Sequence, residues 1–299
     1  MNTNSQPRFT SQDLSERIKG HIEALANATD AARLSAVIQN YLKAASVFHQ
    51  YSFHNILLIN FAYPCATRVA GFQVWRKLNR WVRKGESGIP ILAPILVKEK
   101  VEGSEDRSFL KGFKVVYVFD ISQTDGDPLP EAPEWKSPER SAELQYRLMT
   151  FARKKGIVVT VKQLAGEIQG VSRGGAIDIA PDAGTSTLLH ELAHELLHRG
   201  PDAPSERGLR ELEAESVAWV CSRHFGLDSS GSPNYIALHG NSAELILKHL
   251  ERIRKVAAEI IEAVQSSSTP EGGEAFENPP IYATTLDPDC ELSDADPGL

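Results

Sequence analysis

The sequence has little cysteine and no long apolar run. Its 299 residues include three cysteines, at positions 65, 221 and 290, and none forms a C-x-x-C pair. This usage predicts neither a disulfide framework nor a thiolate zinc cluster, so any metal must use histidine and carboxylate ligands. No run of 18 apolar residues occurs, and the chain does not start with a basic segment followed by an apolar one. We therefore expect a cytoplasmic protein with no membrane partner.

The net charge of −7 is unevenly distributed along the chain. Residues 1–130 carry 16 basic and 12 acidic side chains, a net charge of +4, whereas residues 131–299 carry 16 and 27, a net charge of −11. The first part has a charge balance compatible with nucleic acid, and the second does not.

Composition also indicates where the chain divides. Residues 123–138 contain four prolines and several acids, which is typical of a linker, and place a boundary near residue 130. From residue 266 onward there are eight acids, five prolines and no basic residue, a composition typical of disorder. The sequence thus predicts a domain at 1–130, a second at 131–265 and an acidic disordered tail at 266–299.

The apolar periodicity predicts an α+β fold. For the first domain we expect helical structure over 11–58, a short helix over 71–82, and two strands at 89–97 and 113–121 that can pair as a hairpin. The second domain should be mostly helical with a small sheet: strands at 157–161 and 176–180, and helices at 138–155, 184–198, 206–225 and 242–264.

The most informative motif is His190-Glu191-Leu192-Ala193-His194. On a helix, residues four apart share a face, so both histidines can point at one cation while Glu191 reaches a metal-bound water. The alternative is an amphipathic surface helix with incidental histidines. His198 shares the face but lies about 12 Å along the axis from His190, too far to hold the same ion.

A third protein ligand is therefore needed, and the next helix offers Glu211 and Glu215, again four apart. We predict Glu211 as the ligand and Glu215 as the residue that orients a ligating imidazole. Exchanged roles, or two solvated helix charges, are the alternatives. This donor set suits Zn²⁺, with Mn²⁺ also possible.

Such a site predicts hydrolysis of a peptide bond, with Glu191 as the general base for a metal-bound water. The strand at 176–180 leads into the motif helix and is either an edge that pairs with an extended substrate or an interior strand. Tyr235 and His239 are available as oxyanion donors.

Between Ala66 and Gly85 the chain has basic and aromatic residues but no acid. Cations can follow phosphates while aromatic rings stack on unpaired bases, so this stretch predicts binding of single-stranded DNA. A solvated basic face over a core of aromatics, or a protein-binding module, are the alternatives. The candidate DNA contacts are Arg68, Trp75, Arg76, Lys77, Arg80, Trp81, Arg83 and Lys84.

Two segments carry a family resemblance. The stretch H-E-L-A-H-E-L-L-H at 190–198, followed by E-L-E-A-E-S-V-A at 211–218, resembles ImmA/IrrE-type metallopeptidases and the peptidase part of ArdC antirestriction proteins. That resemblance implies a gluzincin-like, zincin-like domain with Glu211 as third ligand and Glu215 at the acidic position after it. Residues 48–55, 66–72, 75–78 and 82–86 resemble the ArdC-like single-stranded-DNA-binding domain.

Together these features predict a zinc-dependent metallopeptidase that hydrolyses peptide bonds of a protein substrate. Its N-terminal domain should bind single-stranded DNA. The alternative is an antirestriction-type DNA-binding protein whose metal site is structural or regulatory.

Overall fold

The structure is a computed structural model that describes residues 9–26, 31–99, 107–129, 138–227, 233, 238 and 242–266. It has an α+β fold and divides into two compact units. The first holds the described residues up to Glu23 and within His54–Glu131, and the second those within Ala24–Phe53 and Ala132–Pro280. Residues 24–53 group with the second unit, and the boundary near residue 130 stays a prediction.

Some predictions concern residues that lie outside the described parts of the chain. Apart from Ser266, the predicted tail lies outside the described residues, as do Tyr235 and His239. Among the helices that are described, none is both long enough and apolar enough to cross a bilayer.

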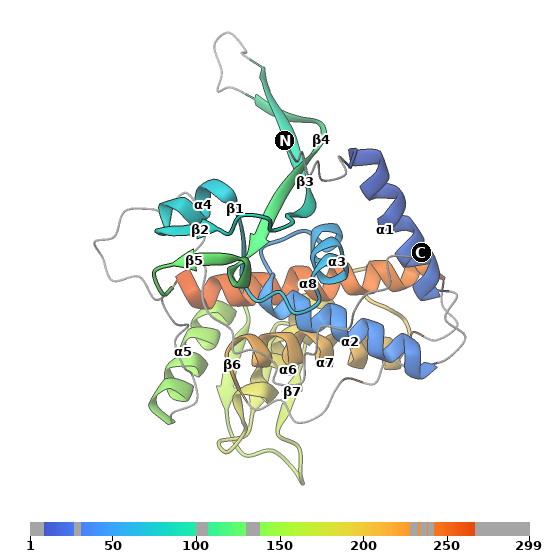
Figure 1. Cartoon of the computed structure of the whole chain (residues 1–299). Helices are drawn as coiled ribbons and strands as arrows, with labels where there is room; N and C mark the ends of the chain where they lie inside the picture. The colour runs from blue at the N-terminus through green and yellow to red at the C-terminus, as the bar shows by residue number, and fades with distance from the viewer. Residues whose placement is uncertain are drawn as a thin grey trace, which may run out of the picture. The chain divides into compact units, whose positions relative to one another are not determined.

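The first unit combines helices with short strands around one long hairpin (Figure 1). Its elements are α1 (Ser11–Ala26), α3 (Phe53–Ala62), β1 (Val69–Gly71), α4 (Phe72–Lys77), β2 (Arg80–Val82), β3 (Ile89–Glu99), β4 (Arg107–Asp120), the 3-10 helix η1 (Ile121–Gln123) and β5 (Thr124–Gly126). Strand β4 lies between β1 and β3 in an antiparallel sheet, and β2 pairs with β5. Ile89, Ile91 and Val118 of the hairpin are buried, as their position at its base requires.

The predicted helix over 71–82 is shorter in the structure. Helix α4 ends at Lys77, and Asn79 adopts a left-handed conformation with φ of 54°, which a helix does not allow. Arg80–Val82 then pairs as a strand with Thr124–Gly126, 44 positions further along the chain. The helix prediction was wrong there because the pairing partner is not local.

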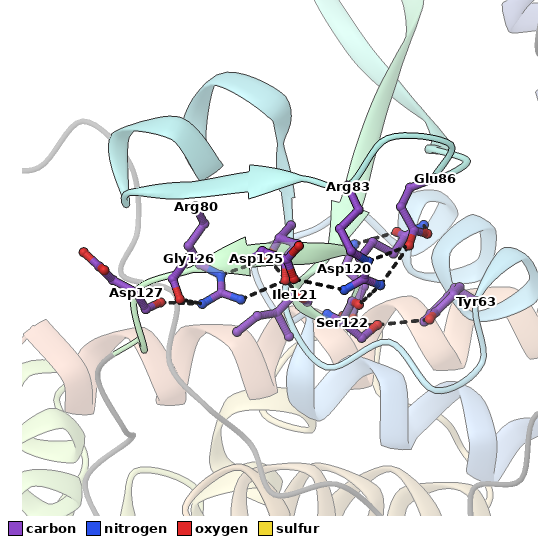
Figure 2. A network of polar contacts seen from close by, with 12 residues as sticks. Tyr63, Arg80, Arg83, Glu86, Asp120, Ile121, Ser122, Asp125, Gly126 and Asp127 are labelled. Atoms are coloured by element: carbon purple, nitrogen blue, oxygen red, sulfur yellow. Dashed lines mark hydrogen bonds and ion pairs between the residues drawn. The ribbon is translucent and has the colours of Figure 1, made fainter.

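A buried carboxylate fixes the corner that follows β4 (Figure 2). Asp120 is 1% exposed and accepts hydrogen bonds from the backbone N–H groups of Thr67 and Arg68, at 2.8 and 2.9 Å. Its other oxygen accepts from the backbone and hydroxyl of Ser122, whose hydroxyl also contacts Tyr63. Because both oxygens of Asp120 have hydrogen-bond partners, this carboxyl group can lie inside the unit at little cost.

The second unit packs helices around a small sheet. Its elements are α2 (Ala31–Val47), α5 (Pro138–Lys154), β6 (Val158–Val161), β7 (Gly170–Ser172), β8 (Ala176–Ile179), α6 (Thr185–Leu197), α7 (Arg207–His224) and α8 (Ala243–Ser266). The sheet order is β6-β8-β7, with β8 parallel to β6 and antiparallel to β7. The strand predicted at 176–180 is therefore interior, and β7 is the edge strand beside α6.

A buried histidine and a partly buried one pack edge to face in the second unit. The ring centroids of His49 and His224 are 4.8 Å apart. His224 donates from Nδ1 to the Ser46 carbonyl oxygen and accepts from Gln265 at Nε2, which is the pattern of a neutral ring. Within the described part of the chain, neither ring nitrogen of His49 has a hydrogen-bond partner. Burial, with a smaller contribution from His224, lowers the pKa of His49 to about 3.

The burial of His49 predicts that the protein loses stability in mild acid. The unfolded chain binds a proton at position 49 below its ordinary pKa near 6.5, while the folded chain stays neutral down to about pH 3. The unfolded state therefore gains protons first, and stability falls as the pH drops through this window. From pH 7 to pH 5, His49 should contribute a loss of about 2 kcal/mol in the free energy of unfolding.

Urea denaturation at the two pH values tests this. The His49→Gln variant should show a pH-dependent loss smaller by about that amount. An equal loss in the variant and the natural chain would contradict the assignment.

Candidate metal centre and nucleic-acid surface

Helix α6 places His190 and His194 side by side. It starts after Gly184 and continues to Leu197, so both histidines lie within its regular part, one turn apart. Their Nε2 atoms are 3.0 Å apart, and their ring planes meet at 76°. Burial lowers the pKa of His194 to about 4, so its ring is neutral at pH 7 and keeps a lone pair for a cation.

Helix α7 brings a carboxylate to the same point. Glu211 Oε2 lies 3.5 Å from His190 Nε2 and 3.4 Å from His194 Nε2. Each of the three residues offers a ligand atom, and these atoms lie within 4.8 Å of one another. The structure therefore brings together the three side chains predicted as ligands.

The spacing of these atoms fits one small cation. Tetrahedral ligands about 2.0–2.1 Å from an ion are about 3.3 Å from one another. The donor atoms of His190, His194 and Glu211 are 3.0 to 3.5 Å apart, close to that separation. Three protein ligands would leave a fourth position for water.

Glu191 packs beside this point, between α6 and the edge strand β7. It is buried, and burial raises the pKa of its carboxyl. A Cβ at Gly170 would lie 2.8 Å from Glu191 Cγ and 2.9 Å from Thr187 Cγ2, so only glycine allows β7 to approach α6 so closely. Glu191 is thus held next to the three ligands by packing.

A second carboxylate on α6 ties the helix to the turn between β7 and β8. Glu195 accepts hydrogen bonds from the Ser172 hydroxyl and from the backbone N–H groups of Arg173, Gly174 and Gly175, at 2.6 to 3.1 Å. Burial acts to raise its pKa, but these donors outweigh it and hold the pKa of Glu195 below its ordinary value. The turn therefore fixes the rotation of α6 and with it the direction of both histidines.

The side chains that surround His194 differ from the expected ones. Glu215, predicted to orient an imidazole, is exposed. His198 Nδ1 instead lies 3.0 Å from His194 Nδ1, and His198 Nε2 lies 2.9 Å from the fully buried Glu213. Spacing alone could not single out Glu213, although a glutamate among apolar residues on α7, with His249 and Arg252 three apart on α8, is a usable signal.

Two candidate DNA contacts of the first unit serve the fold instead. Trp75 is fully buried and donates from Nε1 to the Phe119 carbonyl oxygen, so it presents no face to a base. Arg80 is buried and donates to Thr124 and to the carbonyl oxygens of Gly126 and Asp127 (Figure 2).

Two other arginines of the set are partly engaged. Arg68 is half-buried. Arg83 is exposed but donates to Glu86 and to the Ser122 carbonyl oxygen, and it also lies near Asp125 (Figure 2). Contact with a phosphate would have to compete with these bonds.

The remaining candidates, Arg76, Lys77, Trp81 and Lys84, are exposed. Phe72, an aromatic residue of the same stretch, is exposed as well. Further exposed rings and cations on β4 were not singled out from the sequence: Phe109, Lys111, Phe113 and Lys114. A signal was present, because the whole of β4 before Asp120 has basic residues and no acid.

Comparison with known proteins relates the first half of the chain to one family. Residues 11–153 match the family model described as the N-terminal domain of anti-restriction factor ArdC. An uncharacterized protein of Bacillus anthracis is 25% identical over 270 residues, which cover 73% of this chain and 46% of that protein. The chain therefore spans less than half the length of this relative.

Two crystal structures of the antirestriction protein ArdC from plasmid R388 are also similar. The metal-free structure is 18% identical, covers 72% of this chain and 84% of its own, and has a TM-score of 0.43. The Mn(II)-bound structure is 14% identical, covers 80% and 99%, and has a TM-score of 0.42.

The geometry predicts that loss of any one ligand side chain abolishes tight metal binding. Alanine at His190, His194 or Glu211 leaves two ligands, too few for a stable zinc site. Equilibrium dialysis against zinc should find one bound ion per natural chain and none in these variants. The matched control is Glu215→Ala on the exposed face of α7, which should retain the ion; equal retention by all four variants would refute the site.

Proposed function

We propose that this chain is a cytoplasmic DNA-binding protein of the ArdC antirestriction type whose second unit carries a metal centre. The observation that carries the proposal is the match of residues 11–153 to the N-terminal domain of anti-restriction factor ArdC. Antirestriction protects DNA from restriction enzymes, so contact with DNA is the first activity that the proposal requires.

The chemistry of the exposed residues supports single-stranded DNA as the ligand of the first unit. Trp81 is 54% exposed and Phe113 is 49% exposed, so both rings have free faces for bases. Arg76 and Lys77 at the end of α4 and Lys114 on β4 add exposed positive charge. Rings that stack and cations that pair with phosphates bind single strands with little dependence on base sequence.

The proposed metal site of the second unit holds one zinc ion, with manganese as the alternative, and its ligands are His190, His194 and Glu211. An ion held by two residues of α6 and one of α7 cross-links these helices. The free energy by which it stabilises the folded state grows with the logarithm of the ratio of the ion's concentration to its dissociation constant. This structural or regulatory role is the leading form of the proposal.

The position of Glu191 supports a second candidate function, a metal-dependent peptidase that acts on a protein substrate. A bound ion would supply a polarised water at this point. Glu191 follows a ligand directly and packs against Gly170 of β7, where a carboxylate can take up and return a proton. The resemblance of residues 190–198 and 211–218 to ImmA/IrrE-type metallopeptidases is a further argument for this second candidate function.

The DNA proposal predicts that Trp81→Ala weakens binding of single-stranded DNA by about 1–3 kcal/mol, through the loss of one stacked base. Replacing both Arg76 and Lys77 by alanine should lower the slope of log affinity against log salt by about 1.4, since each phosphate contact contributes about 0.7. Fluorescence anisotropy of a labelled oligonucleotide with the full chain measures both effects.

The matched control is Lys19→Ala, which removes an exposed lysine of α1 paired with Glu23. It should leave the affinity and the salt slope unchanged. If the natural chain shows no salt-sensitive binding, the DNA proposal fails.

Glu191→Gln separates the two candidate functions, because it leaves the three ligands in place and removes the base. Under the leading form, this variant protects unmodified plasmid DNA in a restriction-proficient bacterial host as well as the natural chain does. A loss of protection, with zinc and DNA binding retained, would overturn that form in favour of the peptidase. Glu215→Gln, on the exposed face of α7, is the control for a nonspecific effect.

A further inference from the structure

A continuous chain of hydrogen bonds leads from His194 into the core of the second unit. His194 Nδ1 lies 3.0 Å from His198 Nδ1, and His198 Nε2 lies 2.9 Å from Glu213 Oε2. The side chains of His198 and Glu213 are 7% and 0% exposed, so water does not compete for these contacts. The chain therefore joins a proposed metal ligand to a buried charge.

The direction of this chain follows from the chemistry of its members. A carboxylate only accepts, so His198 must donate to Glu213 from Nε2. In a neutral ring, His198 then has an unprotonated Nδ1, which must accept a hydrogen bond from His194 Nδ1. This places the proton of His194 on Nδ1 and leaves the Nε2 lone pair beside His190 and Glu211. Glu213 thus selects the tautomer of His194 that can bind a cation.

Helix α8 completes the arrangement. Arg252 donates from Nε to Glu213 Oε1 at 2.9 Å, and His249 Nδ1 lies 2.8 Å from the same oxygen. Arg252 also donates to the carbonyl oxygen of Leu197 in the last turn of α6, at 2.8 Å. One side chain of α8 therefore holds both the buried carboxylate and the end of the helix that carries the histidines.

We infer that Glu213 is a positioning residue for the metal centre, acting on His194 through His198, and that Arg252 makes metal affinity depend on the docking of α8. The inference rests on the metal centre of the proposed function. A buried glutamate is costly, and apolar packing would stabilise the junction of α6, α7 and α8 equally well. The orientation and tautomer of a ligating imidazole, by contrast, are fixed by an acceptor for its other N–H group, and Glu213 makes His198 that acceptor.

Zinc affinity, measured by competition with a chromophoric chelator on the full chain, tests the inference. His198→Phe keeps an aromatic ring but removes both hydrogen bonds, and Glu213→Gln removes the charge. Both should weaken zinc binding by about 10- to 100-fold. Arg252→Met should weaken it in the same direction.

Two matched variants make the result specific. His198→Gln can still accept from His194 and donate to Glu213, so it should recover most of the affinity lost in His198→Phe. Glu215→Gln, two residues from Glu213 but exposed, should match the natural chain.

A spectroscopic measurement does not depend on affinity. Long-range ¹H–¹⁵N correlation spectra of the metal-free chain should show His194 protonated on Nδ1, and His198→Phe should shift it toward the Nε2 tautomer. An unchanged tautomer of His194 in His198→Phe overturns the inference. Unchanged zinc affinity in both His198→Phe and Glu213→Gln also overturns it, provided that the natural chain binds zinc and His190→Ala does not. If the natural chain itself binds no zinc, the proposed metal centre fails, and the inference falls with it.

Discussion

The close approach of two imidazoles on α6 and one carboxylate on α7 is the arrangement that the rest of the second unit supports. Side chains with their lone pairs directed at one point repel one another unless a proton or a cation lies between them. The fold holds them there by packing and by hydrogen bonds. Gly170 allows β7 to contact α6, and the Glu195 carboxylate accepts hydrogen bonds from three backbone N–H groups of the turn between β7 and β8. A cation at this point would turn a repulsive arrangement into a cross-link.

The first unit uses charge differently. Its buried Asp120 and its buried Arg80 have several hydrogen-bond partners each, so they stabilise the corner after β4 and the pairing of β2 with β5. The cations that remain exposed, together with rings such as Trp81, are therefore the groups that can meet a ligand. A run of basic residues in the sequence thus contains some that stabilise the fold and others that are exposed to a ligand. Only their burial and their hydrogen bonds distinguish the two kinds.

The sequence predicted most where the controlling geometry is local. The spacing of His190 and His194 predicts a shared helix face because the pitch of a helix does not depend on the rest of the chain. The boundaries of α5 to α8 were predicted within a few residues for the same reason, from caps, glycines and prolines. Strands β2 and β5 were missed, since each exists only through its distant partner.

The surroundings of the site depend on tertiary packing and so were harder to predict. Glu215 has the helical spacing expected of an orienting residue, yet it is exposed, while Glu213 is buried because α8 covers that face of α7. His198 was excluded as a ligand by its distance from His190, and its contact with His194 became visible only in the structure. Trp75 appeared to be a stacking ring because its burial depends on residues of β4 more than 40 positions away.

The proposed metal site consists of two histidines and one glutamate of the second unit. X-ray absorption spectroscopy at the zinc edge of the zinc-loaded protein identifies the ligands of the ion. The proposed site should give nitrogen and oxygen scatterers at about 2.0–2.2 Å, with the multiple-scattering pattern of two imidazoles. A sulfur scatterer at about 2.3 Å, or a shell without imidazole, would contradict it.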